Sequence, residues 1–374
     1  MKKTMMMTAA LLVAVVLTGC LEVANERAAR DAQIGKASID ELSITIDEGL
    51  ANVRALEPGR LVLWGQAPLL DMEVAVTEDG GGPWEIRLRN AMADAELNVT
   101  AADGTAITGF GDGATDLPTV KSWTLDLEGG QTYSLQVTTP DADQSERWRY
   151  AVYADVQDRI DGVQDMYDRM REDPDIRFAL ISGDLTEQGG TEELLRFQRE
   201  METLPFPCFA TLGNHELGVN QFNFHKFFGR GNFSFEFRGV RFTLIDSASA
   251  TLANRVYRWL EEDWLPAGAD KLHMVMMHIP PQDPAGQRNG AFASRGEANK
   301  LLAMLARAGV DLTVYGHVHT YRAFSNAGIE AIISGGGGAI PQRLDGIGRH
   351  YLIVEADPED QRLVTSVVRV FPEN

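Results

Sequence analysis

From residue 147 onward, short apolar runs alternate with stretches whose apolar residues recur at helical spacing, a pattern typical of strands and helices in turn. The stretch after residue 155 repeats its apolar residues on one helical face, and another helix is expected to open at Thr191. A hairpin is expected over residues 234–245, around Arg238-Gly239. The apolar runs predict strands at 149–154, 176–181, 206–212, 271–277 and 310–315. We therefore expect an α/β domain over residues 147–374.

Residues 43–140 show a different pattern, in which short β-prone runs are separated by turn residues at regular intervals. This spacing predicts an all-β, sandwich-like domain. Residues 21–42 are polar and rich in alanine, and are expected to form a tether with some helical tendency. Within residues 43–140, the expected strands are 60–64, 71–76, 84–88, 96–100, 122–127 and 132–138.

The first twenty residues have the pattern of a signal peptide: a basic start, an almost wholly apolar stretch over 5–18, and then Leu17-Thr18-Gly19-Cys20. The end of this segment resembles the lipobox of bacterial lipoproteins, which implies that Cys20 becomes the lipidated first residue. Two or more acyl chains would anchor the protein stably. Because Leu21 is not aspartate, the resemblance favours the outer membrane. The alternative is an ordinary secretory signal in which the cysteine occurs by chance.

The composition is that of a globular protein, with 44% hydrophobic and 24% charged residues among 374. The net charge of −20 argues against binding to a nucleic-acid backbone through a basic patch. The second cysteine, Cys208, lies in an apolar stretch and is expected to pack as a small hydrophobe. With Cys20 acylated, no disulfide is expected. No apolar run after the signal peptide is long enough to span a membrane.

Polar side chains follow the predicted strands of the α/β domain, just past their carboxyl ends, where ligands bind in open α/β sheets. Carboxylate, amide and imidazole groups of this kind are ligands for divalent metal ions. The residues in these positions are Asp155 and Gln157, Asp184 after Gly183, Asn214 to Glu216 after Gly213, His278, and His317 and His319 after Gly316.

These pieces occur in the order D-x-Q, GD, GNHE, H and GHVH. Over roughly residues 148–370 the chain thereby resembles the calcineurin-like metallophosphoesterase family, whose motifs run D-x-H, GD, GNH(E/D), H and GHxH. The resemblance implies two packed mixed β-sheets flanked by helices. One departure stands out, because the histidine of D-x-H is Gln157 here.

Carried over residue by residue, the resemblance implies two metal ions bridged by Asp184. One ion would be held by Asp155, Gln157, Asp184 and His319, and the other by Asp184, Asn214, His278 and His317. His215 would donate a proton to the leaving group, and the carboxylate of Glu187 would orient it. The alternatives are that Glu187 is an exposed loop carboxylate and that Gln157 turns away, leaving water to complete the shell.

Local patterns add three expectations. His317 and His319 alternate, so an extended strand would point both to the same face. His273 is expected on the solvent face of its strand. An oxygen-rich first site suits Mn²⁺ or Mg²⁺, whereas an imidazole-rich second site suits Fe²⁺ or Zn²⁺, so we expect activity to depend on added metal, above all Mn²⁺.

The resulting hypothesis is a lipid-anchored enzyme of the bacterial cell envelope that hydrolyses a phosphomonoester or phosphodiester through a metal-bridging hydroxide. One alternative is a metal-retaining binding protein of the same fold that has lost turnover. Another is an enzyme in which the β-sandwich forms part of the substrate cleft. The sequence leaves the substrate and the oligomeric state open.

Overall fold

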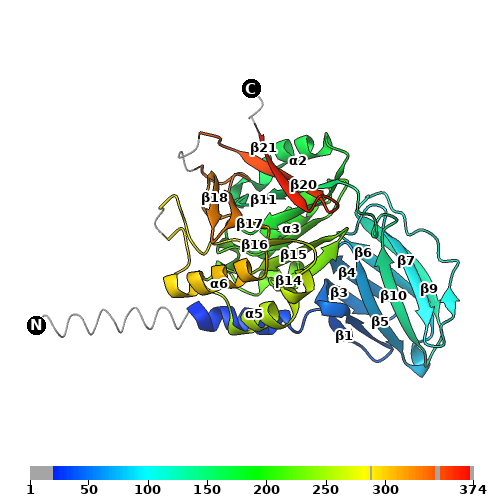
Figure 1. The fold of residues 1–374 in the computed structure, drawn as a ribbon. Coiled ribbons are helices and arrows are strands. Elements are labelled where there is room, and N and C mark those ends of the chain that lie inside the picture. Colours follow the sequence, from blue (N-terminus) through cyan, green and yellow to red (C-terminus); the bar gives the residue numbers. More distant parts are fainter. Residues whose placement is uncertain (1–19, 287–288, 342–345, 371–374) are drawn as a thin grey trace, which may run out of the picture.

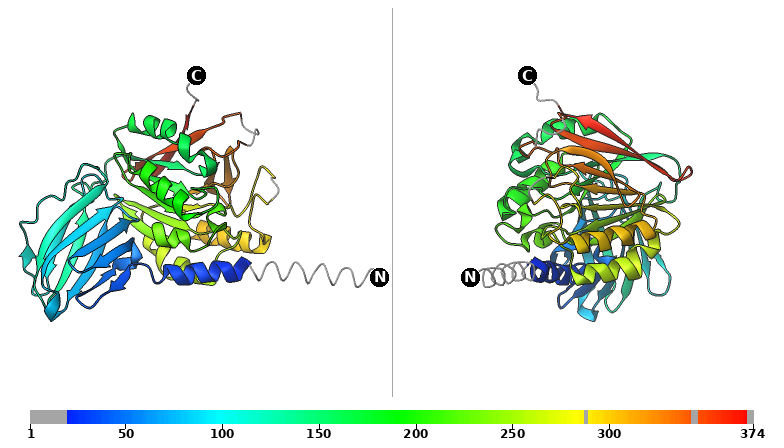
Figure 2. Two further views of the ribbon diagram at one scale, coloured as in Figure 1. Left: turned by 180° about the vertical axis from the view of Figure 1, so that it is seen from behind. Right: turned by 60° about the vertical axis from the view of Figure 1, so that its left-hand side comes forward.

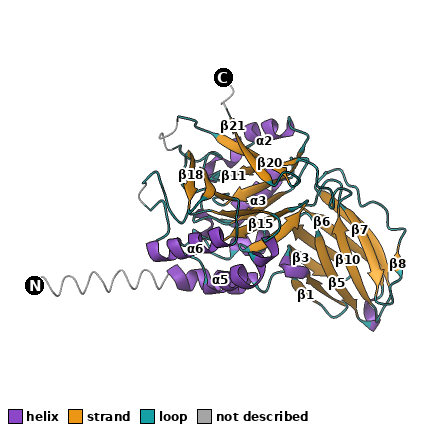
Figure 3. Ribbon diagram, in the orientation of Figure 1, coloured by secondary structure: helices purple, strands orange, loops and turns teal. Residues whose placement is uncertain are grey.

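The computed structural model describes residues 20–286, 289–341 and 346–370. Figure 1 shows an all-β part at one end and a mixed α/β part at the other, and Figure 3 shows that most helices belong to the α/β part. The mixed α/β fold expected for residues 147–374 is therefore confirmed, with extensive β structure before it. The signal peptide proposed for residues 1–20 lies outside the described residues except for Cys20.

The N-terminal part is built from two sheets that pack face to face. Most strand pairs are antiparallel, but β4 and β6 run parallel. Inward side chains alternate with outward ones, as in β2, where Leu42, Ile44 and Ile46 are buried and the residues between them are exposed. One sheet has the order β1 (Lys36–Ser38), β2 (Leu42–Ile46), β5 (Leu70–Val76), β10 (Thr132–Thr138), β7 (Glu96–Ala101), β8 (Ala106–Ile107); the other has the order β3 (Ala51–Glu57), β4 (Arg60–Gly65), β6 (Gly82–Arg89), β9 (Val120–Leu127).

The α/β part also contains two sheets, and both combine parallel and antiparallel pairs. The hairpin expected around Arg238-Gly239 joins β14 to β15 through two residues of positive φ. The first sheet has the order β13 (Cys208–Thr211), β12 (Ile176–Ser182), β11 (Trp148–Tyr153), β20 (His350–Asp357), β21 (Arg362–Arg369); the second has the order β14 (Phe233–Phe237), β15 (Val240–Ile245), β16 (Leu272–Met277), β17 (Leu312–Tyr315), β19 (Ile329–Ser334), β18 (Tyr321–Asn326).

Helices cover the outer faces of these two sheets. In β11, Tyr150 and Val152 face the core between the sheets, whereas Ala151 and Tyr153 face the helices. The helices on this side are α2 (Gln164–Arg171) and α3 (Thr191–Met201), and α4 (Asn223–Phe227) adds Phe224 and Phe227 to the same core. The second sheet is covered by α5 (Asn254–Trp259) and α6 (Arg295–Arg307). Burial of strands on both faces explains their continuous apolar runs.

The segment expected to be a tether is packed against the α/β part instead. Residues 20–31 form a helix whose Ala24 and Ala28 belong to the core beneath α5 and α6, and its Arg27 and Asp31 are fully buried. In Figure 1 and in the back view of Figure 2, this helix lies alongside α5. Later in the same segment, residues 36–38 form β1 of the β-sandwich, and Leu42 is the first residue of β2. The expectation of a tether was based on local polarity alone. It is wrong because the polar side chains of this segment have buried partners elsewhere in the fold.

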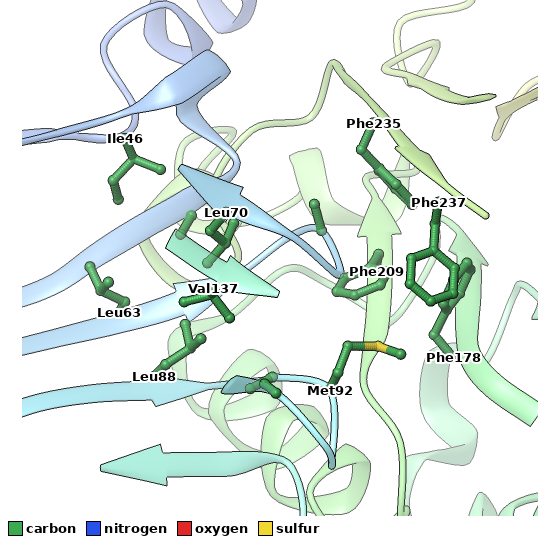
Figure 4. Close-up of a cluster of buried hydrophobic side chains, with 14 of the residues drawn as sticks. Ile46, Leu63, Leu70, Leu88, Met92, Val137, Phe178, Phe209, Phe235 and Phe237 are labelled. Atoms are coloured by element: carbon green, nitrogen blue, oxygen red, sulfur yellow. The ribbon is translucent and has the colours of Figure 1, made fainter. Parts of the chain in front are cut away.

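One apolar core runs from the sandwich into the space between the two α/β sheets. Figure 4 shows Met92 beside Phe209 and Phe178, at the point where the two cores meet. Nearby, the buried Asn90 side chain bonds the edge strand β13 twice: its Nδ2 donates to Cys208 O (2.8 Å), and its Oδ1 accepts from Cys208 N (2.9 Å). The amide of Gln66 pairs in the same way with the backbone of Arg230. The two parts therefore share a continuous packed interface.

Phe224, Phe227 and Phe228 around α4 and Phe233 and Phe235 on β14 are buried and belong to the core. His273 does not face solvent: it is fully buried, with Nε2 2.8 Å from Thr243 Oγ1, and burial lowers its pKa to about 4. Among the described residues, no helix is both long and apolar enough to cross a membrane.

Candidate metal centre

The candidate ligands converge where the carboxyl ends of strands from both α/β sheets meet. Asp155, Asp184 and Asn214 follow β11, β12 and β13 of the first sheet, whereas His278 and His317 follow β16 and β17 of the second. The expected position past the strand ends is confirmed. The arrangement differs from a single sheet edge, because the site is closed by two sheets that face each other.

The backbone at this junction is held in an uncommon conformation. Asp155, Gln157, Asp184 and His317 all have φ between 51° and 69°, a left-handed region that costs non-glycine residues about 1–3 kcal/mol each. Hydrogen bonds between the loops hold this conformation: Val156 N donates to Asp184 O (2.9 Å) and Ala339 N to Asp155 O (2.8 Å). Such strain persists only where the surrounding structure over-determines it, and here it turns side chains toward one point.

One group of potential metal ligands consists of Asp155, Asp184 and His319, with ligand atoms that all lie within 4.8 Å of one another. The two carboxylates are fully buried or nearly so. Gln157 does not turn away from this group, since its Nε2 lies 3.0 Å from Asp184 Oδ2 and 3.2 Å from His319 Nε2. As placed, the amide donates to Asp184, and a half-turn would present Oε1 to the same point.

A second group consists of Asp184, His278 and His317, again within 4.8 Å of one another. Asn214 belongs to this group by position, because its Oδ1 lies 3.1 Å from His278 Nε2. Asp184 is common to both groups, which is the arrangement required of a carboxylate that bridges two ions. The structure thus brings together all seven residues expected as ligands.

Backbone carbonyls orient the three imidazoles of the two groups. His278 Nδ1 donates to Ser182 O (2.7 Å) and His319 Nδ1 to Ile340 O (2.9 Å), so in both rings Nε2 is the nitrogen that faces the site. His317 is reversed: its Nε2 donates to Asn289 O (2.9 Å), which leaves Nδ1 as the possible ligand atom. A carbonyl on the far ring nitrogen fixes the tautomer that binds a metal.

The two histidines after β17 converge for a reason other than strand alternation. β17 ends at Tyr315, and the chain then makes two tight turns, in which Val318 N donates to Gly316 O (2.8 Å) and Thr320 N to Val318 O (2.6 Å). The expectation of an extended strand through His317 and His319 is therefore wrong in its geometry, although both side chains reach the site.

The electrostatics of the bridging position are those of a buried anion next to imidazoles. Burial alone would raise the pKa of Asp184, but His278 beside it holds that pKa well below its usual range. Burial would correspondingly lower the pKa of His278, and the Asp184 carboxylate raises it to about 9. The negative charge on Asp184 is thus strongly favoured, and a buried anion of this kind is a natural position for cations.

His215 lies at the rim of the site, with its Nδ1 2.7 Å from the backbone oxygen of Glu187. The carbonyl can only accept, so Nδ1 carries a hydrogen and Nε2 is the nitrogen that gains or loses a proton. The Glu187 carboxylate lies farther away, with Oε2 3.6 Å from Nδ1. The orienting partner is therefore mainly the main chain of Glu187, a contact that no side-chain pattern in the sequence could indicate.

The sequence analysis assigned no role to Glu216, which proves to organise the site from below. It is completely buried, and its carboxylate accepts from the backbone nitrogens of Asp184 (2.9 Å), Gly213 (2.8 Å) and Thr186 (3.0 Å). Burial, with the nearby Asp184 carboxylate, raises the pKa of Glu216 to about 7. An acidic residue directly after Asn214-His215 was the available signal, but its hydrogen-bond partners come from a separate loop.

Glycine is required where the loops pass closest to the carboxylates. A Cβ on Gly213 would lie 2.1 Å from Asp184 Oδ1, and a Cβ on Gly335 would lie 2.4 Å from Val318 O and 2.8 Å from Asp155 Oδ2. The glycine-rich segment after β19 therefore allows the backbone to pass beside the metal ligands.

A cavity of about 800 Å³ lies next to the site. Asn289, whose carbonyl orients His317, is one of its lining residues, and Arg295 at the start of α6 is another. The described residues that line it all lie between 281 and 299, so none comes from the β-sandwich.

Comparisons with known proteins give matches to part of the chain. No curated protein matches the sequence. Solved structures with similar folds include GAP50, described as the anchor in the inner membrane complex of Plasmodium (16% identity, 60% of this chain and 85% of that one, TM-score 0.46). PhoD is another (10% identity, 81% and 87%, TM-score 0.47), as is a dimetal phosphatase from Danio rerio (13% identity, 60% and 99%, TM-score 0.43).

The family comparison covers the segment from β11 to the start of β18. That segment contains every residue of the two ligand groups, together with His215 and Glu216. Residues 149–321 match the calcineurin-like phosphoesterase family.

Proposed function

We propose that this protein is a dinuclear metal-dependent phosphohydrolase that cleaves a phosphomonoester or phosphodiester. The observation that carries the proposal is the pair of ligand groups that share Asp184, each with its ligand atoms within 4.8 Å of one another. Three imidazoles support it, because each is held by a backbone carbonyl on one ring nitrogen and turns the other ring nitrogen toward the ligand groups.

The residues present fit two divalent ions. Asp155, Gln157 and His319 would hold one and Asn214, His278 and His317 the other, with Asp184 shared. Bound there, the ions would polarise the phosphoryl group and activate the attacking water. The first group is richer in oxygen and the second in imidazole nitrogen, which makes Mn²⁺ our first choice and Fe²⁺ or Zn²⁺ the alternatives.

His215 would act as the general acid. Its Nδ1–H is engaged by Glu187 O, so only Nε2 can deliver a proton, and Nε2 lies 3.8 Å from Asp184 Oδ2, on the side of the ligand groups. The backbone oxygen of Glu187 would hold the imidazole ring of His215 in place to donate a proton to the oxygen of the leaving group.

Cys20 is part of the same proposal. Its side chain is partly accessible, and it follows an apolar segment with the pattern of a lipoprotein signal. We place the enzyme at the bacterial cell envelope, anchored by acyl chains on Cys20, with the outer membrane as the expected location.

The experiment compares aryl phosphate mono- and diesters of graded leaving-group pKa, with Mn²⁺ added, in wild type, His215→Ala and Asp184→Ala. Asp184→Ala should lose activity and metal together. His215→Ala should keep both metals and lose about 10²–10⁴-fold in turnover of poor leaving groups, but much less for good ones. Wild-type protein that binds two metals yet turns over no ester would instead indicate a metal-retaining binding protein.

A further inference from the structure

The helix over residues 20–31 is locked onto the α/β part by buried charges. Arg27 donates from Nε to Asp246 Oδ2 (2.7 Å) and from Nη2 to Asp246 Oδ1 (3.1 Å), and neither side chain is exposed by more than 2%. Asp31 accepts from Gly231 N (2.8 Å) and from Asn232 Nδ2 (2.7 Å). A helix fixed at both Arg27 and Asp31 cannot pivot, so the direction in which Cys20 points is set by the fold.

This direction is toward the face of the metal centre. In Figure 1 and in the back view of Figure 2, the first turn of the helix emerges on the same side as the loop before α6 and the loop after β19. The first of these loops contains Asn289, which bonds His317, and the second contains Ile340, which bonds His319. On the proposed acylation of Cys20, the acyl chains at the start of this helix would be the point where the chain meets a membrane.

Apolar side chains are exposed around the metal centre on this face. Of the five large hydrophobic residues that are exposed in the described part of the chain, three lie on segments that follow strands β13 and β19: Ile340 (80% exposed), Val219 (64%) and Phe222 (36%). Val219 N bonds Gln188 O, next to the Glu187 that orients His215. Between Val219 and Phe222, Gln221 accepts from Arg27 and donates to Glu26 of the N-terminal helix.

We propose that the face formed by Val219, Phe222, Ile340 and the first turn of the 20–31 helix rests on the lipid bilayer, so that the metal centre opens at the membrane surface. The inference rests on the proposed anchor at Cys20 and adds the orientation of the protein on the membrane. A chain of net charge −20 gains no attraction from anionic lipids, so apolar contact and the acyl chains are what hold this face.

The test places an environment-sensitive fluorophore on single cysteines in the acylated protein, reconstituted in phosphatidylethanolamine–phosphatidylglycerol vesicles. Val219→Cys and Ile340→Cys report on the proposed face. Leu117→Cys and Val364→Cys are controls, since both positions are exposed and apolar but lie elsewhere, on the sandwich and on β21. The acylated Cys20 has no free thiol, and Cys208 is buried with its pKa raised to about 12, so neither reacts.

Three measurements separate the possible failures. Flotation with the vesicles reports the anchor, hydrolysis of a soluble aryl phosphate reports the enzyme, and quenching by lipids brominated near the headgroup reports the face. We expect strong quenching and a blue shift at positions 219 and 340 and neither at 117 and 364, since interfacial apolar groups enter about 5–10 Å into the bilayer boundary. Floating, active protein with no quenching at 219 and 340, or with equal quenching at all four positions, overturns the orientation alone. Protein that does not float overturns both the anchor and the orientation.

Discussion

At the scale of single residues, we expect Gln157 to influence how tightly the first group of candidate ligands holds an ion. Its amide lies 3.0 Å from Asp184 Oδ2 and 3.2 Å from His319 Nε2, so a replacement side chain would enter the same space. A neutral amide is a weaker ligand for Mn²⁺, Fe²⁺ or Zn²⁺ than an imidazole.

Gln157→His should therefore lower the free Mn²⁺ needed for half-maximal activity by at least about tenfold, the lower end of what a changed ligand environment gives. Metal titration of activity, with calorimetry of Mn²⁺ binding, measures the change. Gln188→His is the matched control, because it adds a histidine at an exposed loop position close by. Superimposable titration curves for wild type and Gln157→His would show that residue 157 does not reach the ion.

Glu216 acts through backbone atoms and needs a different test. Its carboxylate accepts from Asp184 N, Gly213 N, Thr186 N and Thr186 Oγ1. Glu216→Gln places an amide NH₂ against some of these donors, and should lower the free energy of unfolding by about 1–3 kcal/mol. Turnover should fall as well, with KM little changed, because Asp184 moves.

Chemical denaturation and steady-state kinetics measure both effects of Glu216→Gln. Glu193→Gln provides the comparison, since its carboxylate accepts from Gln188 N and Gly190 N in a more exposed setting at the start of α3. If the two variants lose equal stability and neither loses turnover, Glu216 has no part in positioning the site.

At the scale of elements, the helix over residues 20–31 contributes more to stability than its length suggests. Arg27→Met leaves Asp246 buried without its partner, and should lower the free energy of unfolding by about 3–5 kcal/mol. Arg60→Met removes an arginine whose ion pairs with Glu57 and Glu85 are exposed, and should cost no more than about 1 kcal/mol. Denaturant titration of both variants is the measurement, and equal losses would mean that the helix is only loosely docked.

The sequence predicts elements well where a single element supplies the signal. β12 and β16 are buried on both faces, so each is a continuous apolar run, and both were expected within one residue of their bounds. β3, by contrast, is interrupted by Asn52 and Arg54, whose side chains bond the backbone around α4. The helical tendency of the N-terminal segment was expected, but its docking onto the α/β part was not. That docking depends on a contact between Arg27 and Asp246, which are 219 positions apart in the sequence.

The candidate site shows the same difference between features set within one segment and features set by contacts between distant segments. The motifs were sufficient to predict which candidate ligands come together, because all of them lie just past the ends of strands. The nitrogen that each imidazole presents was not predictable, since the orienting oxygens belong to Ser182, Asn289 and Ile340 in other segments.

At the scale of the whole molecule, the sandwich and the α/β part are expected to unfold together. The Asn90 side chain satisfies both backbone groups of Cys208 on edge strand β13, at the point where the two apolar cores join. Asn90→Ala should leave these groups unpaired and cost about 1–3 kcal/mol, whereas Asn98→Ala on the exposed face of β7 should cost little.

Calorimetry should show a single unfolding transition in wild type, in Asn98→Ala and in Asn90→Ala. The transition of Asn90→Ala should lie at a lower temperature than the other two. Two resolved transitions in wild type would show instead that the sandwich is an independent domain. The cavity beside the metal centre is lined only by residues 281–299 among those described, so the same Asn90→Ala variant should retain its KM for small esters.

The buried charges of the N-terminal helix also bear on how such an enzyme can leave a membrane. A lipoprotein on a loose linker can be shed intact by a protease that cuts the linker. Here residues 20–31 form a helix that is already buried at Ala24, so little chain lies between the proposed anchor at Cys20 and the folded body. A cut after Arg27 would remove the partner of Asp246. On the proposed acylation of Cys20, attachment and integrity would therefore be a single property of this chain, and release by such a cut would amount to inactivation.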